Sequence, residues 1–66
     1  MVNGDTKRET IEQRISRGRR QIVRQLEIVQ ALRLQGYPTD GAERLLINLE
    51  YLQRFNEAQL AKLAHD

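Results

Sequence analysis

The sequence predicts an all-α protein, an antiparallel two-helix hairpin that associates as a homodimeric four-helix bundle. Breaker residues cluster at one place only, around Pro38, and long segments with the hydrophobic periodicity of a helix lie on both sides of it. The chain has 66 residues and no cysteine. Because so small a chain seldom gains more than about 3–5 kcal/mol from its own core, association with a partner is expected.

The first helix is expected over about residues 7–35. Thr6 and Glu9 have the spacing of a capping box, in which the threonine hydroxyl and the glutamate carboxylate satisfy backbone amides at a helix start. Gly36 suits the left-handed conformation that commonly ends a helix, and Pro38 prevents the helix from continuing.

The turn is expected at residues 36–39 and the second helix over about residues 40–64. Thr39 can cap this helix, or Asp40 can do so with Glu43 completing a capping box. No further breaker residue interrupts the segment, so the two helices are expected to form a hairpin.

The whole chain, residues 1–66, is interpreted as a single domain with a flexible start at residues 1–5. With 39% hydrophobic and 30% charged residues, it is too apolar for a disordered chain and too polar for a membrane protein. Its longest aliphatic run, residues 45–47, is far shorter than the about 20 residues that span a bilayer, and the N-terminus lacks the apolar region of a signal peptide. A cytoplasmic location without membrane binding is therefore expected.

Residues spaced alternately by three and four predict the seam along which the two helices pack. The first helix offers Ile11, Ile15, Gly18, Ile22, Gln25, Val29 and Leu32, and the second offers Ala42, Leu45, Leu49, Leu52, Asn56, Gln59 and Leu63. When these residues are paired from the turn outward, the two residue numbers in every pair add up to 74. Antiparallel neighbours require such a constant sum. The expected core of the hairpin or the oligomer consists of Ile11, Ile15, Ile22, Leu26, Val29, Leu32, Leu45, Leu49, Leu52 and Leu63.

Two residues of this expected seam, Gly18 and Asn56, are unusual and lie opposite each other. A glycine inside a helix costs up to about 1 kcal/mol relative to alanine. Either a close approach of the other helix requires Gly18, or it is a tolerated defect. Asn56 either fixes the register of the helices or faces water at a loose layer.

A second apolar stripe lies on nearly the opposite side of the second helix and consists of Ile47, Tyr51 and Phe55, spaced by four. A lone hairpin would leave these side chains in water, and an exposed apolar patch usually marks an interface. The stripe is a candidate second interface, within the homodimer or with a further partner. The alternative is that Tyr51 and Phe55 cover the edge of the seam.

One spaced pattern covers both helices and the turn, and it consists of Ile15, Gly18, Ile22, Gln25, Val29, Leu32, Gly36, Thr39, Ala42, Leu45 and Leu46. Over about residues 14–60 it resembles short two-helix proteins of rhizobia and other alphaproteobacteria. The resemblance implies a stand-alone two-helix fold in a bacterial cytoplasm and implies no activity.

Many of those proteins have histidine and arginine late in the second helix, where this chain has Asn56, Ala58, Gln59 and Lys62. No histidine-dependent role is therefore expected. In shape, though not in sequence, the expected dimer is similar to the RNA-binding hairpin dimers that control plasmid copy number.

The residue types predict that the protein is not an enzyme and holds no metal or cofactor. The single histidine, His65, has no cysteine or second histidine with which to share a metal ion. Glu43, Glu50 and Glu57 repeat every seven residues, which is typical of a solvated helix edge rather than an acid–base pair. No glycine-rich phosphate-binding loop occurs.

An arginine cluster makes the first half of the chain basic. Residues 1–36 hold eight basic and four acidic residues, whereas residues 37–66 hold three and five. The cluster consists of Arg14, Arg17, Arg19, Arg20 and Arg24, of which Arg14, Arg17, Arg20 and Arg24 form a candidate face for an anionic partner. A phosphate backbone or an acidic protein would suit this face, but a solvated face that pairs with glutamates is the simpler interpretation. No aromatic residue lies among the arginines to stack on bases, so nucleic acid is the less favoured partner.

The expected function is that of a small helical-hairpin interaction or scaffold protein that self-associates and binds a protein partner. The alternative is a nucleic-acid-binding, specifically RNA-binding, regulator that uses the arginine face of the first helix.

Overall fold

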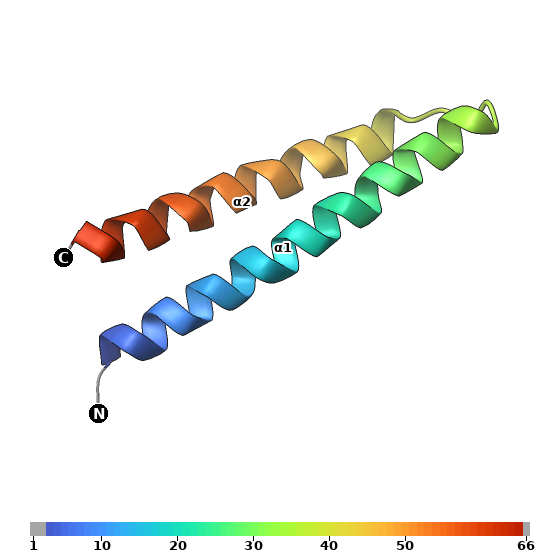
Figure 1. Ribbon diagram of the computed structural model, residues 1–66. Helices are drawn as coiled ribbons and strands as arrows, with labels where there is room; N and C mark the ends of the chain where they lie inside the picture. Colours follow the sequence, from blue (N-terminus) through green and yellow to red (C-terminus); the bar gives the residue numbers. More distant parts are fainter. Residues whose placement is uncertain (1–2, 66) are drawn as a thin grey trace.

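The protein is an antiparallel pair of long helices. The computed structural model describes the backbone of residues 3–65 and the side chains of residues 6–64. Helix α1 spans Asn3–Leu34 and helix α2 spans Asp40–His65, and the two pack against each other along the hairpin (Figure 1). The Cα atoms fill a rod of 53 × 15 × 13 Å. The predicted all-α hairpin is confirmed, and its association as a four-helix bundle stays a prediction.

Helix α1 begins earlier than the capping-box pattern predicts. It starts at Asn3, so Thr6 lies inside the helix, where its carbonyl oxygen accepts a hydrogen bond of 3.0 Å from Thr10 Oγ1. The prediction of a start near Lys7 is wrong, because no proline between Asn3 and Thr6 excludes a further helical turn. Of the start that was expected to be flexible, residues 3–5 are helical and residues 1–2 lie outside the described part of the chain.

The turn at residues 35–39 is built on Gly36. Its φ of 77° is the left-handed conformation that was predicted to end the first helix. Two bonds close the helix end: the Gly36 amide donates to the Arg33 carbonyl at 3.0 Å, and the Tyr37 amide donates to the Leu32 carbonyl at 2.9 Å. This pair of bonds is the Schellman motif, which satisfies carbonyl groups that the end of the helix leaves free.

Helix α2 begins as one of the two predicted caps requires. The Glu43 amide donates to the Thr39 carbonyl at 2.8 Å, which makes Thr39 the N-cap residue. The Glu43 carboxylate accepts bonds from the Thr39 hydroxyl at 2.9 Å and from the Arg33 guanidinium at 2.6 Å. This carboxylate therefore links the last turn of α1 to the first turn of α2.

The side of α1 that packs on α2 is the predicted one. Ile11, Ile15 and Val29 are buried, as is Gln25, and Gly18, Ile22 and Leu32 are half-buried. All seven belong to the predicted seam of the first helix.

The side of α2 that packs on α1 differs from the prediction by a rotation. The half-buried residues at seam spacing are Ala42, Leu46, Leu49, Asn56, Leu60 and Leu63, with the buried Gln53 among them. Leu45 and Leu52 are exposed, at 49% and 55%, and Gln59 is exposed as well. Their predicted placement in the seam between the helices is wrong. Ala42, Leu49, Asn56 and Leu63 keep their predicted places, and at the alternate positions α2 turns the next residue toward α1, a rotation of about half the 100° between consecutive residues. Leu26 of the predicted core is exposed too.

The pairing across the seam differs from the prediction at the middle of the hairpin. There Gly18 lies against Gln53, a pair whose numbers add up to 71 rather than 74. Gln53 Nε2 donates to the Ile15 carbonyl at 2.9 Å, and Gln25 Nε2 donates to the Ala42 carbonyl at 2.9 Å. Each helix thus sends one glutamine to a backbone carbonyl of the other, and these two bonds account for the observed register better than leucine packing alone.

Candidate interaction surfaces

Gly18 of α1 lies directly against the side-chain amide of Gln53 of α2. A Cβ atom at position 18 would overlap Gln53 Oε1 and lie 3.2 Å from Gln53 Cδ. The group that approaches Gly18 is thus the end of a side chain of the second helix and not its backbone. The approaching residue is Gln53 and not Asn56.

A hollow lies directly beside this contact, on one long face of the hairpin. It has a volume of about 260 Å³ and is lined by Arg14, Arg17, Gly18 and Gln21 of α1 and by Leu49, Leu52, Gln53 and Asn56 of α2. Half-buried Asn56 thus forms part of a surface depression rather than of a layer opposite Gly18.

Exposed aliphatic side chains continue this face toward the turn. Ile28 follows Gln21 by seven residues, and Leu45 precedes Leu52 by seven, so each lies two helical turns along the same side of its helix. Both Ile28 and Leu45 are exposed. We call the surface formed by Ile28, Leu45, Leu52 and the hollow the leucine face.

The second predicted stripe lies on the outer side of α2. Ile47, Tyr51 and Phe55 are each more than half exposed, which excludes the alternative that Tyr51 and Phe55 cover the edge of the seam. We call these three residues the aromatic stripe. Ile47 and Tyr51 lie away from the leucine face, because Tyr51 is rotated from Leu52 by about 100° around α2. Phe55 follows Leu52 by three residues and borders that face.

The arginine cluster is exposed along α1, and its members border two depressions. Arg14 and Arg17 line the hollow of the leucine face, whereas Arg19, Arg20 and Arg24 line a shallow depression of about 390 Å³ with Val23 and Glu27. Arg20 donates a hydrogen bond of 3.1 Å to Ser16 Oγ. Among the side chains of residues 6–64, the one ion pair joins Arg33 to Glu43, so the cluster is not neutralised within this part of the chain.

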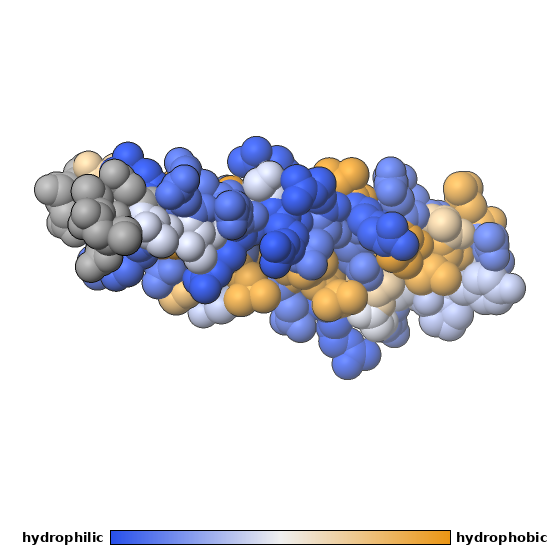
Figure 2. All heavy atoms as spheres, turned by 90° about the horizontal axis from the view of Figure 1, so that it is seen from below, coloured by the Kyte–Doolittle hydropathy of each residue, from blue (hydrophilic) through white to orange (hydrophobic). Residues whose placement is uncertain are grey.

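Hydrophobic and hydrophilic residues alternate over the surface seen from the α1 side. Figure 2 shows hydrophobic groups in the middle of the rod and toward the turn, set among hydrophilic side chains. The exposed hydrophobic residues of α1 are Val23, Leu26, Ile28 and Leu34. Their place in the second half of α1 puts the apolar surface of this helix near the turn.

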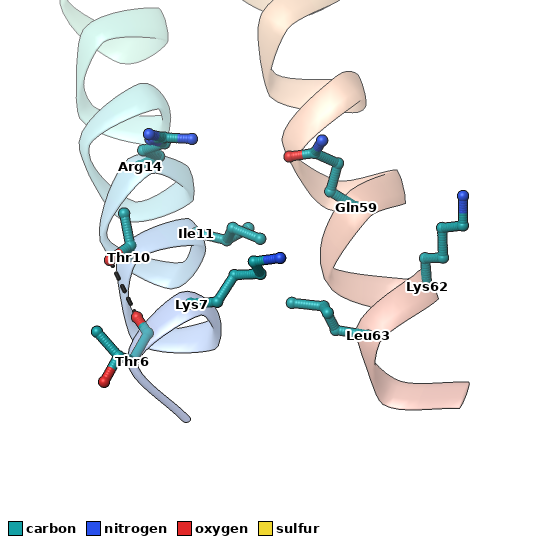
Figure 3. A pocket seen from close by; sticks show the side chains of 8 residues that line it. All are labelled: Thr6, Lys7, Thr10, Ile11, Arg14, Gln59, Lys62 and Leu63. Carbon is teal, nitrogen blue, oxygen red and sulfur yellow. Dashed lines mark hydrogen bonds between the residues drawn. The ribbon is translucent and has the colours of Figure 1, made fainter. Parts of the chain in front are cut away.

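The open end of the hairpin contains a depression of about 690 Å³. Ile11 and Leu63 point toward each other from the two helices, and Lys7 points toward α2 (Figure 3). With Arg14 and Lys62 also in its wall, the depression carries three positive charges and no carboxylate. Figure 1 shows that the two helices diverge toward this end, and side chains of both helices line the depression.

The residues that the structure describes include no cluster that could hold a metal ion. No three His, Cys, Asp or Glu side chains of that part of the chain lie close enough to hold a metal ion. Neither helix, over its described residues, has a segment that is long and apolar enough to cross a membrane.

Comparisons with known proteins leave the surfaces as the main guide to function. The chain matches no protein-family model, no curated protein and no solved structure.

One functional feature was not predicted from the sequence: that Leu45 and Leu52 lie outside the seam. The signal was present in the width of the apolar stripe on α2, which includes Leu46 and Leu60 beside the predicted positions. Such width shows that a helix contacts more than one neighbour, but it does not show which residue contacts which neighbour.

Proposed function

We propose that the protein is a small, non-enzymatic helical-hairpin interaction protein that self-associates as a homodimer and binds a protein partner. One observation supports this proposal above all. In the described part of the chain, three apolar side chains are buried, whereas ten large hydrophobic side chains are exposed. Exposed hydrophobic side chains that line up along one side of a helix, as Leu45 and Leu52 or Ile47 and Tyr51 do, usually mark an interface.

The energetics of burial favour self-association first. Each square ångström of apolar surface removed from water contributes about 25 cal/mol, and three buried side chains contribute little against the entropy of ordering more than sixty residues. A second hairpin would cover leucines from both copies at once, which is how four-helix bundles complete their core. Because the core of one chain is small, we expect two chains to associate.

The aromatic stripe supports the second part of the proposal, a protein partner. Tyrosine and phenylalanine bring a large contact area at a low cost in conformational entropy, and tyrosine is enriched at protein interfaces. Ile47, Tyr51 and Phe55 follow one side of α2 over two turns. A helix or a groove of another protein could bind along this line.

Sedimentation velocity at several concentrations, with circular dichroism on the same samples, tests self-association. We expect a species of about twice the chain mass of 7.7 kDa that dissociates and loses helicity together on dilution. A fully helical, cooperatively melting monomer at tens of micromolar would overturn the proposal.

Affinity capture with mass spectrometry of protein and RNA tests the partner. Wild-type bait is compared with a Tyr51→Ala, Phe55→Ala variant, which keeps the seam and the arginine cluster. We expect one protein partner to be lost with the variant. Recovery of RNA alone, in equal amounts with both baits, would contradict this part of the proposal.

The second candidate function, binding of RNA or another nucleic acid, is favoured by one observation. Arg17, Arg20 and Arg24 are exposed along α1. None of the three takes part in the one ion pair among the described side chains, which joins Arg33 to Glu43. Phosphate groups could neutralise these arginines. Binding that is selective for sequence at physiological salt would promote this candidate over the first.

A further inference from the structure

The leucine face is the one long side of the hairpin to which both helices bring exposed apolar side chains next to a hollow. Ile28 comes from α1 and Leu45 and Leu52 from α2, and the hollow between the helices continues the same side toward the open end. The aromatic stripe, in contrast, belongs to α2 alone. A four-helix bundle requires contacts from both helices of each hairpin, so the leucine face fits this role and the stripe does not.

The opposite long side is less suited to a contact between copies. Glu43 lies two residues before Leu45, and therefore on the other side of α2, where it pairs with Arg33 across the hairpin. An interface there would remove this ion pair from water, which is costly unless further hydrogen bonds compensate.

The leucines are self-complementary. In a two-fold symmetric contact, residue i of one copy meets residue j of the other, and j meets i. If two α2 helices lie antiparallel, Leu45 of each copy can face Leu52 of the other, with Asn48 close to the symmetry axis. Asn48 lies three residues after Leu45 and four before Leu52, so it shares their side of the helix.

The size of this side matches that of a stable dimer. A rectangle with the two larger extents of the rod, 53 and 15 Å, has an area of about 800 Å². This is about the surface that each partner buries in a standard specific interface. A contact over the length of one face is therefore large enough to hold two copies together.

We propose that the leucine face is the contact between two copies of this chain, related by a two-fold axis close to Asn48. The inference rests on the self-association proposed above and names the surface that carries it. Leu52 of one copy packs beside Leu45 of the other, and side chains of each copy enter the hollow beside Gly18 of its mate. Leu45 and Leu52 thereby become part of the oligomer core, although the seam of the single hairpin does not include them.

Two matched double variants test the surface by sedimentation equilibrium. Leu45→Gln with Leu52→Gln removes two apolar side chains from the leucine face, and Ile47→Gln with Tyr51→Gln removes two from the aromatic stripe. Because four leucines would leave a symmetric interface, we expect the first variant to raise the dimer dissociation constant at least about 100-fold and the second to leave it within about threefold.

A cross-link tests the symmetry without removing an apolar residue. The chain has no cysteine, so Asn48→Cys introduces a single thiol near the proposed axis and Arg54→Cys introduces one on another side of α2. Under mild oxidation we expect a covalent dimer from Asn48→Cys only. Circular dichroism of each variant shows that it retains its helices.

The outcomes separate this inference from the proposed function. If wild type is monomeric, self-association itself fails. If wild type is dimeric but dissociates only with the Ile47 and Tyr51 variant, or cross-links only through Arg54→Cys, self-association stands and the leucine face is not the contact. Dissociation with the leucine variant together with an Asn48→Cys cross-link supports the inference.

Discussion

Gly18 of α1 and Gln53 of α2 are fitted to each other: the glycine leaves the space that the glutamine amide fills. Gln53 is 8% exposed, and its Nε2 atom bonds to the Ile15 carbonyl one turn before Gly18. Any side chain at position 18 would meet the amide oxygen of this glutamine. The pair therefore fixes both the distance and the register of the helices at the middle of the hairpin.

The first prediction is that alanine at position 18 fails to stabilise the protein. Alanine normally gains about 1 kcal/mol over glycine inside a helix. Here the new methyl group overlaps Gln53 Oε1, so the amide must move and lose its bond to the Ile15 carbonyl. We expect Gly18→Ala to lower the free energy of unfolding by about 1 kcal/mol in urea titrations.

Gly41→Ala is the matched control for this prediction. Gly41 lies in the first turn of α2, and a Cβ atom there meets nothing within 4 Å. The control should gain up to about 1 kcal/mol, as the helix propensities require. Equal gains from both substitutions would show that the contact between Gly18 and Gln53 does not constrain the helices.

The second prediction concerns the other half of the pair. Gln53 Oε1 is buried and accepts no hydrogen bond from the residues that the structure describes. An unsatisfied buried polar atom costs about 1–3 kcal/mol. Gln53→Met keeps a long unbranched side chain and removes the oxygen, so we expect it to raise the free energy of unfolding by about 1 kcal/mol at constant protein concentration.

Gln53→Ala provides the comparison. It removes the polar atom but also leaves a gap opposite Gly18, and we expect a loss of about 1–2 kcal/mol. If methionine destabilised the protein as much as alanine does, the bond to Ile15 would matter more than the unsatisfied oxygen costs. The urea midpoints of the two variants therefore compare the loss of the bond to the Ile15 carbonyl with the gain from removing the unsatisfied oxygen.

Gln25 and Gln53 also explain which features of the fold can be predicted from the sequence and which cannot. Hydrophobic spacing and the breaker cluster predict the helices, the turn and the correct side of α1, because apolar periodicity and Gly36 act locally. The side of α2 depends on where Gln25 and Gln53 find partners across the seam. A heptad pattern counts a glutamine as an imperfect member, and it does not indicate that the amide can reach a carbonyl of the other helix.

The surfaces are predicted less completely than the helices for the same reason. The aromatic stripe follows from spacing alone and is exposed as expected. The leucine face becomes visible only after the rotation of α2 is known, since Leu45 and Leu46 are equally apolar and adjacent. Which of two neighbouring leucines faces α1 depends on the contacts across the seam and not on composition.

The third prediction compares two isoleucines that undergo the same substitution. Ile15 is buried in the seam, whereas Ile47 lies in the exposed aromatic stripe. We expect Ile15→Ala to cost roughly 2–5 kcal/mol as a large-to-small change in the core. Ile47→Ala should cost less than about 1 kcal/mol. Thermal and urea unfolding at one concentration measure both, and a larger loss from Ile47→Ala would show that the stripe is covered in the folded protein.

The last prediction is that any affinity for nucleic acid is electrostatic and does not depend on sequence. Each phosphate that the arginine cluster neutralises adds about −0.9 to the log–log slope of affinity against salt on duplex DNA. Specific recognition needs contacts to base edges or stacking on aromatic rings. The cluster offers at most Gln21 and Gln25 for base edges, and Gln25 is already bonded to the Ala42 carbonyl. We therefore expect binding to fall steeply between low and physiological salt and to be equal for unrelated sequences.

Fluorescence anisotropy at two salt concentrations measures this, with two variants that remove the same charge. Arg17→Gln, Arg20→Gln and Arg24→Gln act on the cluster, whereas Arg44→Gln, Arg54→Gln and Lys62→Gln act on α2. If the cluster binds phosphates, the first variant should flatten the salt slope by about 0.9 for each phosphate that it no longer neutralises. The second variant should change the slope less. Tight, sequence-selective binding that persists at physiological salt and disappears only with the first variant would contradict the prediction, because it requires base contacts that these arginines would then have to supply.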